Sequence, residues 1–202
     1  MMTLVFVVCA YLLGSISFAM ISSKLFSLPD PRTYGSGNPG ATNVLRSGKK
    51  AAAALTLFGD AAKGWLAVFL AIRYSLPGEQ YMMLPAAVAI AVFAGHLFPI
   101  FLRFKGGKGV ATALGVLLGL NVLLGLGGLV TWMFMALVFR YSSLAALTAA
   151  VATPIYAESL GLPREWVLAS GIMSLLLIWR HKSNIKNLLA GKETKIGKSK
   201  SA

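Results

Sequence analysis

Four polar segments interrupt an otherwise apolar chain of 202 residues and contain most of its candidates for chemistry. The first, GSGNPGATNVLR, covers residues 35–46. Its glycines permit positive φ and close backbone approach, so that successive N–H groups can point at one anion. Arg46 can add a bidentate fork to a phosphate. We predict an anion-binding loop here, the alternative being a mobile loop of turn residues. Its candidate residues are Gly35, Ser36, Gly37, Asn38, Gly40, Thr42, Asn43 and Arg46.

The second segment, KGGKGVAT over residues 105–112, opens directly into an apolar stretch. Free N–H groups at a helix N-terminus, together with two lysines, make a phosphate site. A Walker A loop is excluded because it needs Ser or Thr after its Gly-Lys pair, and Lys108 is followed by Gly109. The alternative is a plain polar turn. The candidate phosphate-binding residues are Lys105, Gly106, Gly107, Lys108, Gly109 and Thr112.

Three ionisable residues lie inside apolar stretches, where such groups are rare and default to functional candidates. The third polar segment is the motif GHLFP at 95–99. Its His96 is either a functional base or a packed side chain whose hydrogen bonds are satisfied. Asp60 and Lys63 are three residues apart, so on a helix they share a face and can form an ion pair. Such a pair reduces the cost of burying either charge, which favours a structural role for it.

The fourth segment, RHKSNI, covers residues 180–185. Arg180 and Lys182 are typical of basic anchors at the end of a membrane helix. His181 and Asn184 lie about one helical turn apart, so that both side chains can face a shared polar site. We therefore add His181 and Asn184 to the candidate residues.

The composition is that of a membrane protein. Hydrophobic residues make up 57% of the chain and charged residues 12%, whereas soluble domains carry about 25% charged residues. A helix needs about 20 apolar residues to cross the hydrocarbon core of a bilayer. We also expect a turn at 76–79. The expected spans are 3–23, 51–73, 81–102, 110–139 as one helix or as two divided near Asn121, 142–157 and 165–179.

The distribution of charge sets the orientation. Lysine and arginine number 19 against 6 acidic residues, and cytoplasmic loops collect basic residues. With seven spans and the N-terminus outside, every basic residue except Arg73 and Arg164 lies on or near the cytoplasmic face. With six spans, the basic cluster that begins at Arg180 would instead lie on the outer face. We therefore predict an all-α integral membrane protein of about seven transmembrane helices, some of them short, with a cytoplasmic C-terminus. Residues 1–190 would form a single membrane-embedded domain, and 191–202 a disordered basic cytoplasmic tail.

The sequence also narrows the classes of function. Cys9 is the single cysteine and cannot form an internal disulfide, and with two histidines it gives no support for a zinc or iron–sulfur site. Topology explains most of the positive charge, so no nucleic acid partner is predicted. The first apolar stretch lacks a basic leader and is followed by further spans, which argues against a cleaved signal peptide.

Two alternatives to an enzyme are a transporter of organic phosphates or other anions and a non-catalytic scaffold. A transporter predicts polar residues near the middle of the membrane and a path to both faces. Here the outer turns carry no motif comparable to the four polar segments. A scaffold would leave the density of glycine and asparagine over residues 35–43 unexplained.

Taken together, these segments resemble the bacterial acyl-phosphate:glycerol-3-phosphate acyltransferases, the PlsY family. The resemblance rests on GSGNPGATNVLR at 35–46, GHLFPIFLRFKGGKGVAT at 95–112 and RHKSNI at 180–185, supported by DAAKG at 60–64, and it covers nearly the whole chain. The order and spacing of the motifs also fit. Ser17, where relatives often carry proline, is a minor departure.

The resemblance implies a fold of seven membrane helices in the bacterial inner membrane, with the active site at its cytoplasmic surface. It implies transfer of a fatty acyl chain from acyl phosphate to the 1-hydroxyl of glycerol 3-phosphate, giving lysophosphatidic acid and phosphate. This is the first acylation of phospholipid synthesis. The implied partners are acyl phosphate, glycerol 3-phosphate and membrane lipid, and the family uses neither a metal nor a bound cofactor.

We expect direct attack by the glycerol hydroxyl, because the phosphate of the donor is already a good leaving group. Lys105, Lys108 and the backbone of 106–109 would hold one phosphate. Arg46 with Ser36 would hold the other phosphate or the developing oxyanion. His181 and Asn184 would orient glycerol 3-phosphate. His96 would act as general base, unless a phosphate oxygen of the substrate takes that part.

Overall fold

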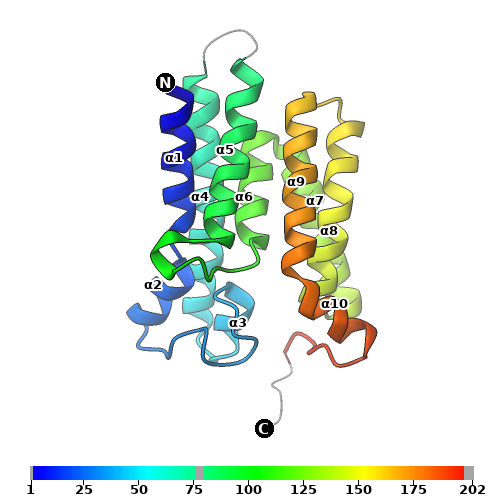
Figure 1. Cartoon of the computed structure of the whole chain (residues 1–202). Coiled ribbons are helices and arrows are strands. Elements are labelled where there is room, and N and C mark those ends of the chain that lie inside the picture. The colour runs from blue at the N-terminus through cyan, green and yellow to red at the C-terminus, as the bar shows by residue number, and fades with distance from the viewer. Residues whose placement is uncertain (1, 76–79, 198–202) are drawn as a thin grey trace.

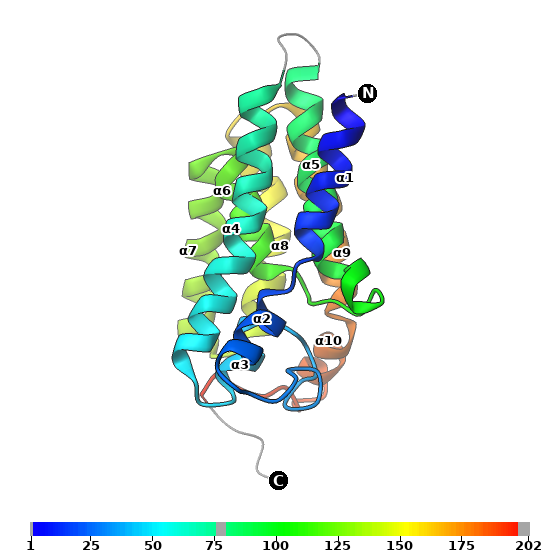
Figure 2. The same cartoon turned by 90° about the vertical axis from the view of Figure 1, so that its left-hand side faces the viewer.

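The structure is a computed structural model that describes residues 2–75 and 80–197. Within those residues all regular secondary structure is helical. The longer helices run side by side, with the beginning of α1 at one end and α2, α3 and α10 at the other (Figures 1 and 2). The turn expected at 76–79 and the last five residues of the tail, 198–202, lie outside the described residues.

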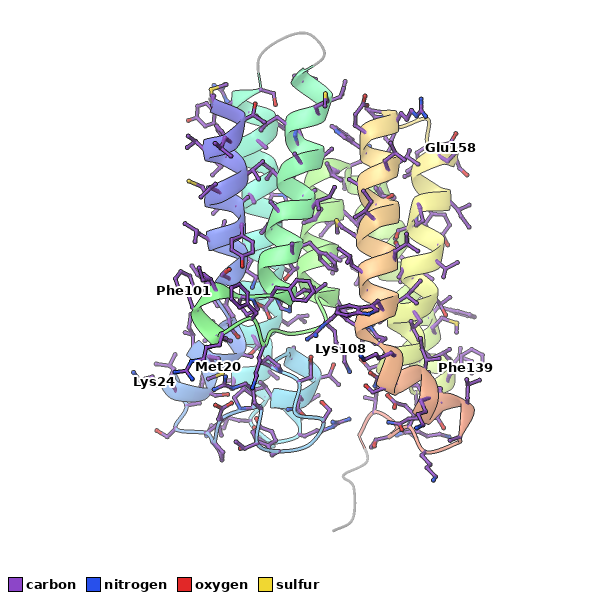
Figure 3. All side chains as sticks on the ribbon, viewed as in Figure 1. Met20, Lys24, Phe101, Lys108, Phe139 and Glu158 are labelled. Carbon is purple, nitrogen blue, oxygen red and sulfur yellow. The ribbon has the colours of Figure 1, made fainter. Side chains whose placement is uncertain are left out.

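The long helices and the short ones separate in space. The long helices are α1 (Met2–Ser15), α4 (Lys50–Tyr74), α5 (Gln80–Leu97), α6 (Val110–Leu120), α7 (Val122–Phe139), α8 (Ser142–Ser159) and α9 (Arg164–Arg180). The short ones are α2 (Phe18–Leu25), α3 (Ala41–Leu45), α10 (Lys182–Leu189) and the 3-10 turn η1 (Ile100–Leu102). Lys24 and Lys108 lie toward the end that carries the short helices, and Glu158 lies at the opposite end (Figure 3).

Among the described residues, four segments are long and apolar enough to cross a membrane. They are Met2–Leu25, Lys50–Tyr74, Tyr81–Leu102 and Val122–Phe139. Large apolar side chains on these and neighbouring helices point away from the protein, such as Val130 on α7 at 63% exposed and Leu175 on α9 at 69%. Exposed apolar surface on this scale suits lipid rather than water. The expected all-helical membrane protein is confirmed.

The break expected near Asn121 is present. Helix α6 ends at Leu120 and α7 begins at Val122. Asn121 has an extended conformation, and its side-chain Oδ1 accepts a hydrogen bond from the backbone N–H of Leu124 at 3.1 Å. This is the N-cap interaction for which asparagine is favoured.

The first span, expected to be continuous over 3–23, is divided into α1 and α2. The interruption falls at Ile16 and Ser17, and it leaves carbonyl oxygens at the end of α1 without helical partners. The buried ammonium of Lys63, on α4, donates to the carbonyls of Gly14 at 2.9 Å and Ile16 at 2.6 Å. The break is therefore stabilised by a donor distant in sequence, which hydropathy does not register.

Lys63 also begins a buried polar network that crosses three helices. Its Nζ lies 2.9 Å from Oδ1 of Asp60 on the same helix, as the spacing predicted. The same carboxylate oxygen lies 3.6 Å from Nδ1 of His96 on α5. That nitrogen is in turn 3.0 Å from the hydroxyl of Thr112 on α6. All four side chains are buried, so the network fixes α4, α5 and α6 relative to one another.

Glycine allows the closest helix pairs to approach backbone to backbone. On α4 and α6, a Cβ at Gly115 would collide with the carbonyl of Ala61. On α1 and α5, a Cβ at Gly14 would collide with the carbonyl of Val92. Small residues at such crossings are typical of membrane proteins, whose helices associate through packing rather than through the hydrophobic effect. These two crossings keep α5 and α6 close to the helices that carry Lys63 and the break in α1.

Substitution of Lys63 tests the structural role of this network. We expect Lys63→Met to destabilise the folded protein by about 3–5 kcal/mol, because it leaves the Asp60 carboxylate buried without its partner. Adding Asp60→Asn should recover part of this loss. Denaturation of the purified variants in detergent measures both effects. An unchanged Lys63→Met variant would show that the ion pair does not support the fold.

Candidate active site

The first glycine-rich loop is organised by Asn43, which is buried on α3. Its Oδ1 accepts hydrogen bonds from the backbone N–H of Ser36 at 2.9 Å and from the guanidinium of Arg46 at 3.3 Å. Its Nδ2 donates to the carbonyls of Pro31 at 2.7 Å and Tyr34 at 3.2 Å. Asn43 was expected to contact an anion, and the structure places it beneath the loop as the residue that shapes it.

This arrangement leaves the polar surface of the loop open. Ser36, Thr42 and Arg46 are exposed. Gly35 has a φ of 60°, and a Cβ there would collide with the Asn43 side chain. The Thr42 hydroxyl lies 3.3 Å from that of Ser142, at the start of α8, and so joins the loop to the other half of the bundle. Asn38, Gly37 and Gly40 lie in the same loop.

The second loop, residues 105–109, leads from η1 into α6 and is held from both sides. The backbone N–H of Gly107 donates to the His96 carbonyl at 3.2 Å. On the other side, Arg180 donates from Nη2 to the Gly106 carbonyl at 2.7 Å and from Nε to the Gly107 carbonyl at 3.2 Å. A Cβ at Gly107 would meet the His96 ring, so only glycine permits this contact with α5. Gly109, at φ 82°, is the N-cap of α6.

His96 and Thr112 therefore lie under the second loop. His96 is buried, and its Nδ1 contacts Thr112 and Asp60. The Thr112 hydroxyl is also buried. The sequence makes both residues candidates for contact with substrate, and in the structure both contribute to the polar network that supports the loop.

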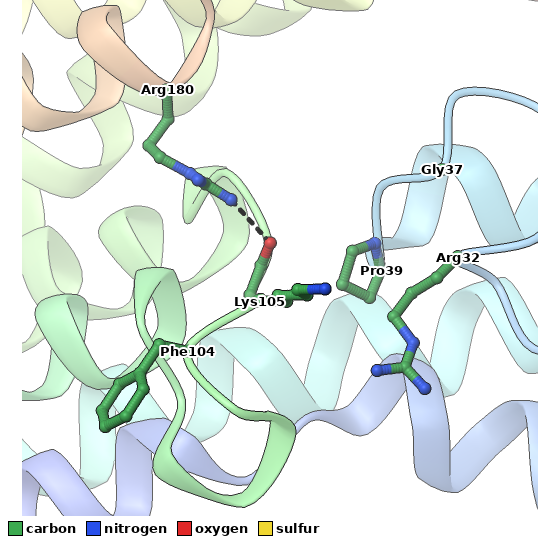
Figure 4. Close-up of a pocket in the computed structure, with 7 residues that line it drawn as sticks. Arg32, Gly37, Pro39, Phe104, Lys105 and Arg180 are labelled. Carbon is green, nitrogen blue, oxygen red and sulfur yellow. Dashed lines mark hydrogen bonds between the residues drawn. The ribbon is translucent and has the colours of Figure 1, made fainter.

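The two lysines of the second loop face different surroundings. The Lys105 side chain, with Arg32 and Arg180, lines a cavity of about 320 Å³ between the loops (Figure 4). Gly37, Pro39, Phe104 and Gly106 complete its lining. The Lys108 ammonium instead donates to Oδ1 of Asn184 on α10 at 2.5 Å.

Glu193 completes the surroundings of Lys108 and was not predicted from the sequence. Its Oε1 accepts hydrogen bonds from Nδ2 of Asn184 and from the hydroxyl of Ser143, both at 2.6 Å. It belongs to the part of the expected tail that the structure describes, 191–197, which also bonds through Ile196 N–H to the Arg140 carbonyl at 2.6 Å. The sequence feature that could have pointed to Glu193 is that it is the one acidic residue in the basic segment 191–202.

The charges at this end of the bundle perturb Lys108. Burial lowers the pKa of its ammonium, and the nearby charges of Arg46 and Arg180 lower this pKa further, whereas Glu193 raises it. Three basic side chains, those of Lys108, Arg46 and Arg180, therefore act on one another here, together with the Glu193 carboxylate. An arrangement of this kind favours the binding of an anion.

His181 is buried and neutral at physiological pH. Burial lowers its pKa to about 4. Its Nδ1 lies 2.8 Å from the carbonyl oxygen of Leu177, which can only accept a hydrogen bond, so Nδ1 carries the proton. The free Nε2 is consequently a hydrogen-bond acceptor. A neutral imidazole of this tautomer suits a hydroxyl group better than a phosphate.

The structure therefore brings both glycine-rich loops and the His181–Asn184 pair to the same end of the bundle. Sequence reasoning missed Arg180, which it treated as a membrane anchor. The fork of Arg180 to two loop carbonyls depends on the packing of α9 beside the loop. No local sequence pattern around residue 180 indicates that contact.

Comparison with known proteins agrees with this geometry. Residues 4–191 match the family described as glycerol-3-phosphate acyltransferase. The chain is 61% identical over 194 residues to the glycerol-3-phosphate acyltransferase of Nitrosospira multiformis, covering 94% of each chain. It is 59% identical over 194 residues to that of Methylobacillus flagellatus, covering 96% of this chain and 97% of the relative.

Two crystal structures of PlsY (YgiH), an integral membrane glycerol 3-phosphate acyltransferase, share the fold. The glycerol 3-phosphate form superimposes with a TM-score of 0.91 at 36% identity, and the lysophosphatidic acid form with 0.89 at 35%. Each comparison covers 98% of this chain and 96% of the other. The resemblance inferred from the motifs is confirmed, and the chain belongs to the glycerol-3-phosphate acyltransferase family, as an integral membrane acyltransferase of phospholipid synthesis.

Proposed function

We propose that this acyltransferase moves a fatty acyl chain from acyl phosphate to the 1-hydroxyl of glycerol 3-phosphate, giving lysophosphatidic acid and phosphate. The observation that carries the proposal is the meeting of two basic, glycine-rich loops with His181 and Asn184. Both substrates are phosphorylated, so two neighbouring anion sites match two anions. The solved relatives named for their glycerol 3-phosphate and lysophosphatidic acid forms support this choice of acceptor and product.

The contact between Lys108 and Asn184 supports an assignment of glycerol 3-phosphate to the second loop. Lys108 and the N-terminus of α6 would hold its phosphate, with Lys105 adding charge from the adjoining cavity. Asn184 would orient the molecule, and Nε2 of His181 would accept a hydrogen bond from a glycerol hydroxyl. Ser36 and Arg46, exposed on the first loop, would then face the acyl phosphate.

The chemistry is a direct acyl transfer. The glycerol hydroxyl oxygen attacks the acyl carbonyl carbon, the bond between that carbon and the phosphate oxygen breaks, and phosphate leaves. The hydroxyl proton passes to an oxygen of the departing phosphate. Arg46 and Ser36 stabilise the negative charge that develops on the carbonyl oxygen. His96 supports the loop from below, so the phosphate oxygen of the substrate takes the part of the base.

We further propose seven membrane crossings, by α1, α4, α5, α6, α7, α8 and α9, with the active site facing the cytoplasm. The concentration of basic residues beside α2, α3 and α10 supports this orientation through the positive-inside rule. Helix α6 has 11 residues and spans only about 16 Å, shorter than a hydrocarbon core of about 30 Å. Its N-terminus therefore places the second loop close to the acyl chains of the bilayer.

Residues 1–190 would form one domain embedded in the bacterial inner membrane, followed by the basic tail that begins at residue 191. A transporter of organic phosphates, the alternative considered from the sequence, is disfavoured by the match to glycerol-3-phosphate acyltransferases. Its distinguishing property would be uptake of intact glycerol 3-phosphate into sealed vesicles without formation of a new product.

A direct assay tests the proposed reaction. Purified protein in detergent, given palmitoyl phosphate and labelled glycerol 3-phosphate, should form labelled lysophosphatidic acid, with one phosphate released per molecule of product. Proteoliposomes that accumulate labelled glycerol 3-phosphate and form no lipid product would instead support the transporter.

Replacement of Arg46 by lysine tests the role of the first loop. We expect Arg46→Lys to lower kcat/KM by about tenfold or more, because lysine cannot reproduce the planar bidentate fork. Arg73→Lys, a matched change in the last turn of α4 and outside both loops, should retain wild-type turnover. Wild-type kinetics in Arg46→Lys would remove Arg46 from the site.

The lowered pKa of Lys108 predicts an alkaline limit to activity. Lysine binds phosphate only while protonated, and burial holds its pKa below that of a free lysine. As pH rises through this lowered pKa, kcat/KM for glycerol 3-phosphate should fall. In Lys108→Arg the fall should move to higher pH, because arginine keeps its charge. Initial rates corrected for spontaneous hydrolysis of acyl phosphate measure the profile. An identical alkaline limb in both proteins would contradict the assignment.

A further inference from the structure

Arg180 makes the only described side-chain hydrogen bonds to the carbonyls of the second loop. Its Nη2 and Nε reach two successive carbonyls, those of Gly106 and Gly107, from one planar guanidinium. Figure 4 shows the first of these hydrogen bonds as a dashed line. The guanidinium carbon also lies 5.9 Å from the ring centres of both Phe98 and Trp179. The fork is thus held by aromatic neighbours on two elements, and its geometry is suited to fixing two acceptors at once.

These two contacts determine which way the loop amides face. In a trans peptide the carbonyl and the following N–H point in opposite directions. With the Gly106 carbonyl turned toward Arg180, the Gly107 N–H turns to the other side, where it meets the His96 carbonyl at 3.2 Å. With the Gly107 carbonyl also turned toward Arg180, the Lys108 N–H must likewise point away from the guanidinium.

The Lys108 N–H has no hydrogen-bond partner within residues 2–75 and 80–197. It stands at the entrance to α6, next to the side chain that contacts Asn184. Two successive glycines give these peptide planes a wide choice of rotations in the absence of a restraint. Rotation of the Gly107–Lys108 plane would exchange a donor for a carbonyl oxygen, which would repel an anion.

We propose that Arg180 is a positioning residue, which fixes the two peptide planes between Gly106 and Lys108 so that the Lys108 N–H faces the phosphate of glycerol 3-phosphate. This inference rests on the proposed function and adds a residue to its machinery. Arg180 acts through the two loop carbonyls to which it donates. It is adjacent to His181 in the sequence. The end of α9 therefore carries both the residue that holds the second loop and the imidazole proposed to accept a hydrogen bond from glycerol 3-phosphate.

The inference predicts an effect that depends on the substrate. We expect Arg180→Gln to raise KM for glycerol 3-phosphate by about tenfold, because a glutamine amide cannot hold both carbonyls. KM for palmitoyl phosphate should change by less than about twofold. Arg180→Lys keeps the charge and can reach one carbonyl. Its KM for glycerol 3-phosphate should therefore lie between that of the wild type and that of Arg180→Gln.

A matched control is Lys182→Gln, which removes a neighbouring basic residue that lies over the Trp179 ring and outside the loop. Both kinetic constants should remain within about twofold of wild type in this variant. Steady-state assays with each substrate varied in turn measure the split. Protection of each protein against thermal denaturation by added glycerol 3-phosphate gives an independent readout that needs no turnover.

The outcomes separate this inference from the proposed reaction. Wild-type protein that forms no lysophosphatidic acid refutes the reaction itself. Wild-type activity with an unchanged KM for glycerol 3-phosphate in Arg180→Gln refutes the positioning role, as does an equal rise in KM for both substrates. If Arg180→Gln does not fold, Arg180→Lys decides: wild-type KM values and wild-type protection refute the proposal, and a selective loss for glycerol 3-phosphate supports it.

Discussion

The buried ammonium of Lys63 is the interaction on which the rest of the structure depends. It satisfies two carbonyls at the break between α1 and α2, and it pairs with Asp60. Together these contacts offset the free-energy cost of burying the ammonium, because a lysine inside a membrane protein is destabilising unless its charge and its donors are all paired. The break directs α2 away from the line of α1, and α2 then packs against α4 at the end where the first loop begins.

The same network reaches the second loop through His96. Its ring contacts Asp60 and Thr112, and its carbonyl accepts the Gly107 N–H. One residue thereby connects the buried ion pair to the second glycine-rich loop. Arg180 holds the opposite side of that loop. A flexible glycine sequence becomes a defined surface because rigid helices restrain it from two directions, which is the preorganisation that binding an anion requires.

Local sequence rules were sufficient for part of this structure. The ion pair of Asp60 and Lys63, the break near Asn121 and the helical, apolar character of the described chain follow from spacing and residue type, and each is present. The break in the first span could not be predicted, since the donor that stabilises it lies 47 residues from Ile16.

The same limit applied within the site. Asn43, His96 and Thr112 stand out in the sequence by their polarity, and the structure adds that all three are buried and hydrogen-bonded beneath the loops. Glu193 was missed because a carboxylate in a basic tail resembles solvated sequence. Its partner Ser143 lies 50 residues away and belongs to another helix.

The proposed use of an activated acyl donor agrees with the electrostatics of the site. His181 is neutral and buried, and His96 is engaged below the loop, so neither is arranged as a strong base. An acyl phosphate reduces the need for one, since its leaving group is good and carries its own basic oxygens. What the reaction requires from the protein is positive charge and fixed donors beside two phosphates. We propose that Arg46, Lys108 and the amides ordered by Arg180 supply these, at a face where membrane topology would already favour basic residues.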